Sequence, residues 1–104
     1  MDKIRMWLDD DRDPADPAVK KTFGLMGNEV WVRSVVEAID LLGGGLVEWM
    51  SLGETGLDAA VWVEDRAFLE KLSRVEWRVH SQDVVTAENM KRALRKADRY
   101  WGVR

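Results

Sequence analysis

Three carboxylates and a guanidinium are adjacent near the start of the chain, at Asp9, Asp10, Asp11 and Arg12. They follow a short apolar stretch, and a carboxylate buried there needs a charged partner or a metal ion. Hard divalent cations such as Mg²⁺ and Mn²⁺ take oxygen ligands, often one or two carboxylates with water and phosphate oxygens. We therefore expect Asp9 and Asp10 to hold such a cation, one directly and one through water. The alternative is that Asp10, Asp11 and Asp13 only solvate a loop and cap a helix.

His80 is the only histidine of the chain, and Ser81 follows it directly. Its ordinary pKa near neutrality suits a general acid or base in phosphoester chemistry. The alternative is a hydrogen-bonded structural histidine at the end of a strand. A mechanism that needs two histidines is excluded. No glycine-rich phosphate loop is present, because Gly43-Gly44-Gly45 follows a predicted helix instead of preceding one.

Four stretches alternate apolar and polar side chains with the two-residue period of a β-strand. The predicted strands cover residues 4–8, 29–33, 46–52 and 75–81. Each of them contains one tryptophan. A strand that is covered on both faces has a nearly continuous run of aliphatic residues instead. We therefore expect one face of the sheet to be thinly covered and shielded by indoles.

Helical patterns lie between these strands. After the acids, Asp16 as a cap and Pro17 at the first position predict one or two helical turns. Ser34 and Glu37 fit a capping box at the start of a second helix. A third helix is predicted after Thr55 as its N-cap, with these inward side chains: Leu57, Ala60, Val61 and Phe68. The last helix is predicted to begin near Thr86, with this buried stripe: Ala87, Met90, Leu94, Ala97 and Trp101.

Strands that alternate with helices predict right-handed crossovers and a mainly parallel sheet. The expected fold is a small α/β three-layer sandwich with four strands and about three main helices. At this length, residues 1–104 are expected to form a single domain. In open parallel sheets, ligands bind outside the carboxyl ends of the strands, which is where the acids are predicted to lie.

The composition narrows the class of protein. The 104 residues are 46% hydrophobic and 34% charged, which is typical of a globular domain and excludes a disordered chain. No apolar run approaches the ~20 residues that a membrane helix needs, and the first residues lack the pattern of a signal peptide. The absence of cysteine excludes a disulfide framework and a thiolate zinc site. These observations predict no membrane partner and a cytoplasmic location.

Four short motifs, taken in order, resemble one family. They are Trp7-Leu8-Asp9-Asp10-Asp11-Arg12, Trp31-Val32-Arg33-Ser34 with Glu37-Ala38-Ile39, Ser51-Leu52 before Thr55-Gly56-Leu57-Asp58, and Val79-His80-Ser81 with Asn89-Met90 and Leu94. In this order they are similar to the divergent response-regulator receivers called cyclic-phosphate processing receiver domains, over nearly the whole chain. The resemblance implies a receiver-like fold with an acidic pocket that acts on, or recognises, terminal or cyclic phosphates of nucleic acids.

The resemblance also assigns roles to individual positions. It implies that Asp9 and Asp10 hold a divalent metal and that Arg12 is the basic residue that follows them. It further implies that His80 and Ser81 are a His-Ser pair at the end of the fourth strand, facing the acids, which makes them the candidate catalytic residues. The remaining positions around the pocket are candidates for ligand binding: Asp11, Arg12, Glu54, Thr55 and Asp83.

Two departures from the family pattern affect the predicted chemistry. The family usually places an Asp-His-Asp run after the Ser-Leu of the third strand, where a receiver keeps its phosphoacceptor aspartate. Here Ser51-Leu52 is followed by Gly53-Glu54-Thr55-Gly56, so a nucleophile or base and one metal ligand are missing. Glu54 is a candidate substitute with a longer side chain. Asp83 stands where the family tends to have asparagine.

Two functional hypotheses follow, and whether the protein is an enzyme stays open between them. The first is a divergent receiver-like interaction module that has lost phosphoacceptor and catalytic function. It would bind a protein partner, a second copy of itself or a phosphate-containing ligand. The alternative is a metal-assisted phosphoesterase, or a binder of terminal or cyclic phosphates on nucleotides or RNA ends.

The predicted last helix carries a row of bases four residues apart, Lys91, Arg95 and Arg99. Such a row either binds nucleic-acid phosphates or only keeps the helix soluble and complements its dipole. The net charge of −3 and the acidic loop predict weak binding of nucleic acid at best.

Overall fold

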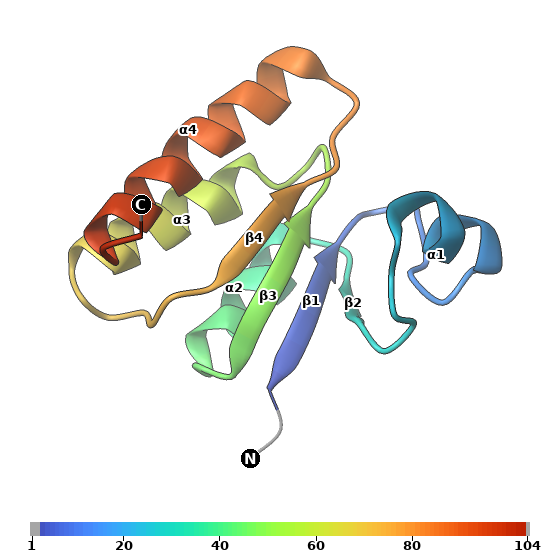
Figure 1. The fold of residues 1–104 in the computed structure, drawn as a ribbon, viewed down its shortest axis with the longest axis horizontal. Coiled ribbons are helices and arrows are strands. Elements are labelled where there is room, and N and C mark those ends of the chain that lie inside the picture. The colour runs from blue at the N-terminus through green and yellow to red at the C-terminus, as the bar shows by residue number, and fades with distance from the viewer. Residues whose placement is uncertain (1–2, 104) are drawn as a thin grey trace.

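A computed structural model describes residues 3–103 of the chain (Figure 1). Its single sheet has four parallel strands in the order β2-β1-β3-β4. The strands are β1 (Ile4–Leu8), β2 (Val30–Val32), β3 (Val47–Leu52) and β4 (Glu76–Val79). The predicted parallel sheet is therefore confirmed, with β2 and β4 somewhat shorter than the sequence pattern suggested.

Four helices connect and follow the strands, one more than the three main helices that were predicted. They are α1 (Pro17–Phe23), α2 (Val35–Gly43), α3 (Leu57–Phe68) and α4 (Val84–Tyr100). The fourth is the short α1, which confirms the one or two helical turns predicted after Asp16 and is stabilised at both ends. The Asp16 side chain accepts a hydrogen bond from the Ala18 backbone N–H, and Gly24 closes the helix with φ of 64°.

The two faces of the sheet are covered unequally. Met6, Leu8, Met50 and Leu52 contribute to the main core, which also takes buried side chains from α2, α3 and α4. On the other face, a smaller cluster contains Trp7, Trp49 and Leu25, with Val19, Phe23 and Trp31 packed against it. Its only helix is α1, which lies apart from the other three helices (Figure 1). The expected indole-shielded face is present, although the tryptophan of β4 packs against the main core instead.

The start of α3 differs from the prediction. Thr55 does not cap the helix, because the N-cap position is Gly56, which makes no side-chain cap hydrogen bond. A Cβ on Gly56 would lie only 2.8 Å from the Leu52 Cβ, so the helix begins directly above the sheet. Its buried residues are Ala59, Ala60, Val63 and Ala67. Val61 and Phe68 were predicted to face inward and are instead exposed.

The last helix agrees with the prediction and begins two residues earlier. The Asp83 carboxylate caps it by accepting a hydrogen bond from the Thr86 backbone N–H at 2.9 Å. The predicted stripe from Ala87 to Ala97 is buried against the main core, and Trp101 packs at its edge. Among residues 3–103, no helix is both long and apolar enough to cross a membrane.

Candidate functional site

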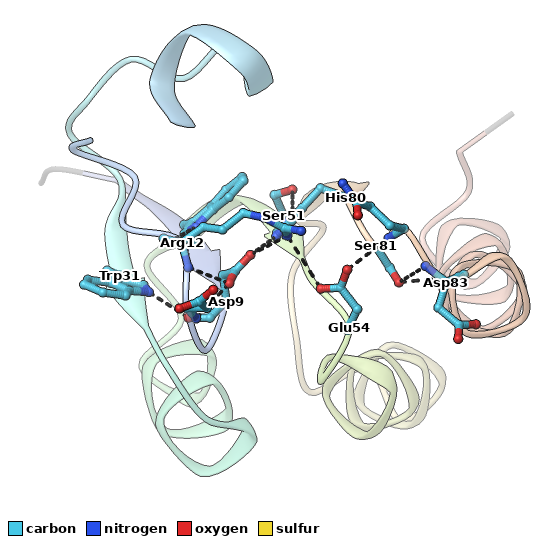
Figure 2. A network of polar contacts seen from close by, with 11 residues as sticks. Asp9, Arg12, Trp31, Ser51, Glu54, His80, Ser81 and Asp83 are labelled. Atoms are coloured by element: carbon cyan, nitrogen blue, oxygen red, sulfur yellow. Dashed lines mark hydrogen bonds and ion pairs between the residues drawn. The ribbon is translucent and has the colours of Figure 1, made fainter. Parts of the chain in front are cut away.

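Asp9, the first residue after β1, lies at the centre of a polar network at the carboxyl end of the sheet (Figure 2). Its side chain is almost completely buried. One carboxylate oxygen, Oδ1, accepts the backbone N–H groups of Asp11 at 2.9 Å and Arg12 at 2.8 Å. The other, Oδ2, accepts Nη1 of Arg12 at 3.0 Å and Nε2 of His80 at 2.9 Å. Four protein donors therefore surround this carboxylate.

His80 reaches Asp9 from the end of β4 and is itself held on several sides. Its Nδ1 lies 2.7 Å from the Ser51 hydroxyl, and its ring stacks on Trp7 at 3.8 Å between ring centres. The Phe23 ring of α1 approaches it edge-on at 5.5 Å. An ionised carboxylate only accepts hydrogen bonds, so Nε2 carries the proton toward Asp9. Ser51 then donates its hydroxyl hydrogen to Nδ1.

The ionisation states follow from burial and these contacts. Burial raises the pKa of Asp9, but the hydrogen bonds from Arg12, Asp11 and His80 outweigh it and hold that pKa below the usual 3.8. Burial lowers the pKa of His80 below 6.5 and outweighs the opposing effect of the Asp9 carboxylate. At neutral pH the network therefore contains an ionised Asp9, a charged Arg12 and a neutral His80.

Gly53 provides the space in which His80 meets Asp9. A Cβ at this position would lie 2.9 Å from His80 Nε2, 3.0 Å from the Leu8 carbonyl oxygen and 3.3 Å from Asp9 Oδ2. A side chain here would have to displace the imidazole or the backbone. The glycine after Leu52 and the His80–Asp9 hydrogen bond are therefore parts of one arrangement.

Arg12 and Glu54 form the rim of the network. Arg12 Nη1 lies 3.6 Å from a Glu54 carboxylate oxygen, and the other Glu54 oxygen accepts the Gln82 backbone N–H at 3.0 Å. That backbone hydrogen bond holds the pKa of Glu54 below its usual value, despite partial burial. The neighbouring charges of Asp9 and Glu54 raise the pKa of Arg12 against the effect of burial. Glu54 thus pairs with the arginine of the network and bridges two loops.

Two indoles fix the backbone around the acids. The Trp7 Nε1–H donates to the Arg12 carbonyl oxygen at 2.9 Å, and the Trp31 Nε1–H donates to the Asp9 carbonyl oxygen at 2.7 Å. Trp31 and its contact are visible in Figure 2. These bonds hold the loop after β1 in the conformation that directs two backbone N–H groups at Oδ1 of Asp9.

The remaining predicted site residues lie outside this network. The side chains of Asp10, Asp11 and Thr55 are exposed. Ser81 was expected to face the acids with His80. Its hydroxyl instead accepts a hydrogen bond from the Asp83 backbone N–H and donates one to the Asp83 carbonyl oxygen, within the turn that leads into α4. The backbone hydrogen bond from Thr86 lowers the pKa of Asp83, consistent with a capping contact.

The serine that contacts His80 is Ser51, which the sequence analysis did not select. Trp7 and Gly53 were likewise missed as parts of the site. The observed register explains the grouping, because Trp7 pairs with Ser51 across β1 and β3, and Ser51 pairs with Arg78 two residues before His80. Side chains two residues apart on a strand share one face. The three groups therefore had to lie on the same face of the sheet.

The residues at this end of the sheet do not fit the predicted divalent metal. Within residues 3–103, no group of three or more histidine, cysteine, aspartate or glutamate side chains is placed to hold a metal ion. Asp9, the buried acid, already has four donors, and two of them belong to a guanidinium and an imidazole. Asp10 points its side chain to solvent. A cation bound to Asp9 would have to displace Arg12 or His80.

The predicted row of bases lies on α4. Arg95 and Arg99 are exposed, and Lys91 is half-buried with its Nζ 3.8 Å from a Glu88 carboxylate oxygen. An ion pair of this kind on a helix surface contributes only a few tenths of a kcal/mol. The row follows Asp83 in the chain but makes no contact with the Asp9 network among the hydrogen bonds and ion pairs of residues 3–103.

A parallel four-stranded sheet, three helices on one face and an acidic residue at the end of β1 define a receiver-like α/β protein. The model of the family described as the cyclic-phosphate processing receiver domain matches residues 4–96. The match covers most of the chain, and the protein belongs to this family. No curated protein and no solved structure matches the chain.

Proposed function

We propose that this protein is a divergent receiver-like interaction module that has lost phosphoacceptor and catalytic function. The observation that carries the proposal is the saturation of the Asp9 carboxylate by Arg12, His80 and two backbone N–H groups. A guanidinium supplies the positive charge that a buried carboxylate otherwise obtains from a metal ion. The network is then a structural element that closes the carboxyl end of the sheet.

The side chains that could act as nucleophile and base are also engaged in hydrogen bonds with other protein groups. Ser51 is completely buried, and its hydroxyl donates to His80. His80 is enclosed by Trp7 and Phe23, and its two ring nitrogens bond Asp9 and Ser51. A general acid or base must reach the proton that it transfers within hydrogen-bond distance of the substrate. No substrate atom can approach either nitrogen without opening the network.

The partner that we propose is a protein. Receiver-like domains serve as interaction modules, and the exposed acids Asp10 and Asp11 beside the closed network disfavour a polyanion. A second copy of the chain is one such partner. Sedimentation equilibrium of the purified protein separates a homodimer from a module that needs another protein.

A divalent-metal titration tests the loss of the metal site. Differential scanning fluorimetry with MgCl₂ and with MnCl₂ is expected to give the same shift in melting temperature for wild type, Asp9→Asn and the exposed-acid control Asp11→Asn. Such a common shift reflects weak surface binding alone. A shift in wild type that Asp9→Asn abolishes and Asp11→Asn retains would overturn the proposal, because it would place a cation on Asp9.

The second candidate function is recognition of a cyclic or terminal phosphate. It is favoured by the family's description and by Arg12, whose side chain is 25% exposed at the rim and presents a guanidinium fork. In that case a ribonucleoside cyclic phosphate shifts the backbone NMR resonances of Arg12 and Glu54, and Arg12→Lys weakens binding. Unchanged resonances at saturating nucleotide would eliminate this candidate.

Nucleic-acid binding by α4 is predicted to be weak. If Arg95 and Arg99 contact phosphates, Arg95→Gln/Arg99→Gln lowers affinity for single-stranded RNA and reduces the slope of log K against log salt by about 1.4, or about 0.7 per contact. Fluorescence anisotropy at several salt concentrations measures both quantities. Micromolar or tighter binding at physiological salt would contradict the prediction.

A further inference from the structure

We propose that a cavity at the amino end of β3 and β4 binds a small organic anion. The cavity has a volume of about 290 Å³ and lies where the end of α2, the second half of α3 and the loop from α3 to β4 meet. Its lining side chains and glycines are Leu42, Gly43, Gly45, Trp62, Arg66, Lys71, Leu72 and Ser73. Small-molecule sites begin at about this size.

The charge of the lining points to an anion. Arg66 and Lys71 contribute two positive charges, and no aspartate or glutamate is among the described residues that line the cavity. Ser73 adds a hydroxyl at the same wall. The combination of a guanidinium, an ammonium and a hydroxyl matches the oxygens of a phosphate or carboxylate group.

Arg66 has an unused donor at this site. Its Nε is buried and has no hydrogen-bond partner among residues 3–103. Its guanidinium carbon lies 5.3 Å from the centre of the Trp62 ring, a cation–π arrangement that holds the side chain in place. Buried polar groups are normally hydrogen-bonded, and a donor left without a partner is costly. Because the Nε has almost no accessible surface, the other N–H groups of the Arg66 guanidinium are the donors that a bound anion would contact.

The remaining lining is apolar and limits the class of ligand. Leu42 and Leu72 are core or core-edge residues, and Trp62 packs beside them. The wall near Gly43 is open, because a Cβ there would meet no atom within 4 Å. The cavity therefore suits an anionic head group with a small apolar body, such as an aryl phosphate or an aryl carboxylate.

The loop that carries Lys71 into the cavity is already fixed in shape. Glu70 adopts φ of 59°, the left-handed conformation in which glycine is usual. It lets the Lys71 backbone N–H bond the Arg66 carbonyl at 2.9 Å and the Glu70 N–H bond the Ala67 carbonyl at 3.1 Å. From the other side, the Trp101 Nε1–H donates to the Leu72 carbonyl at 2.8 Å. A pre-organised loop lowers the entropy that a ligand must offset.

NMR titration of the full chain tests this site. Phenyl phosphate and benzoate are the two organic probes, and inorganic phosphate is the head group alone. Phenyl phosphate and benzoate are both expected to shift the Trp62 indole and Lys71 backbone resonances. The probe that binds more tightly identifies phosphate or carboxylate as the preferred head group. Inorganic phosphate is expected to bind more weakly, because it leaves the apolar wall uncovered. If neither organic probe perturbs these resonances, the proposal fails.

Charge variants make the assignment specific. Arg66→Gln and Lys71→Gln should each weaken binding of the stronger probe by about tenfold, the effect of losing one charged hydrogen bond. Lys91→Gln on α4 is the matched control and should bind like wild type. Lys71 is exposed, so its variant remains informative even if Arg66→Gln folds poorly. Equal affinity of Lys71→Gln and wild type would overturn the site.

Discussion

The charged side chains at the two ends of the sheet are partnered in opposite ways. At the carboxyl end, Asp9, Arg12 and His80 satisfy one another, and indoles and Phe23 enclose them. At the amino end, Arg66 and Lys71 line a cavity, and a buried Arg66 donor has no partner among residues 3–103. In open parallel sheets the carboxyl end is the usual ligand site. In this protein the side chains at the carboxyl end pair with one another, and the proposed anion site lies at the amino end instead.

The proposed loss of the catalytic site leaves no void at the carboxyl end of the sheet. Gly53 leaves space at the end of β3, and the His80 imidazole fills it beside Asp9. The carboxylate keeps a full set of donors, so no unpaired charge remains buried. That the family's Asp-His-Asp run is missing after Leu52 stays a prediction.

Removing the Asp9 charge at the carboxyl end of the sheet should have the largest effect on stability. Asp9→Asn leaves Arg12 without its main partner and places an amide among four donors, so it should lower the free energy of unfolding by about 3 kcal/mol. Urea denaturation measures the change. At the amino end, Lys71→Gln should alter stability by less than about 0.5 kcal/mol, because exposed changes have small effects. Equal losses in the two variants would contradict the comparison.

Adding a methyl group at the carboxyl end of the sheet should lower stability, whereas adding one at the amino end should raise it. Gly53→Ala places a Cβ against His80 and the Leu8 carbonyl and should cost about 2 kcal/mol. Gly43→Ala, in the last turn of α2, meets no atom within 4 Å and should stabilise the protein by about 0.5 kcal/mol. Thermal and urea unfolding give both values. The same substitution can be made in a His80→Ala background. If Gly53→Ala lowers the free energy of unfolding there by the same amount, the imidazole is not what the new methyl group contacts.

The protonation of His80 should make stability depend on pH. Burial lowers its pKa in the folded chain, so the unfolded chain binds a proton first as the pH falls below 6.5. Stability is therefore highest near neutrality and decreases below about 6.5. The lowered pKa of Asp9 causes a second decrease only below 3.8. In urea titrations across pH, the His80→Gln variant should not show the decrease in stability below pH 6.5. If the variant still shows this decrease, a group other than His80 causes it.

A smaller effect than those at Asp9 and Gly53 is predicted from backbone strain at the amino end of the sheet. Glu70 is an exposed non-glycine residue with φ of 59° at the end of α3. Glu70→Gly should raise the free energy of unfolding by about 1 kcal/mol, because glycine adopts this conformation without a steric penalty. Glu70→Ala is the control and should bring no gain. If the alanine variant is stabilised equally, the effect comes from the lost charge and not from the backbone.

The local sequence was sufficient to predict most of the fold. Alternation in Ile4–Leu8, the Ser34 cap of α2 and the stripe on α4 depend on residues a few positions apart, and the structure confirms each of them. Of the predicted capping box, only the serine half is present, because the Glu37 carboxylate accepts a hydrogen bond from the Ser34 hydroxyl instead of a backbone N–H. The same local signals misjudged α3. Thr55 resembles an N-cap, but the close packing of Gly56 on Leu52 sets the start of the helix and therefore which of its side chains are buried.

The site shows where local information ends. The sequence by itself determined that Asp9 and His80 end strands of a parallel sheet, and hence that both lie at its carboxyl edge. Only the tertiary structure decided that Arg12 and His80 occupy both sides of the carboxylate, that Ser51 replaces Ser81 as the partner of the histidine, and that Asp10 faces solvent. Such choices depend on distances of a few tenths of an ångström between residues as far apart as Asp9 and His80. Those distances are set by strand register and packing, which no short stretch of sequence contains.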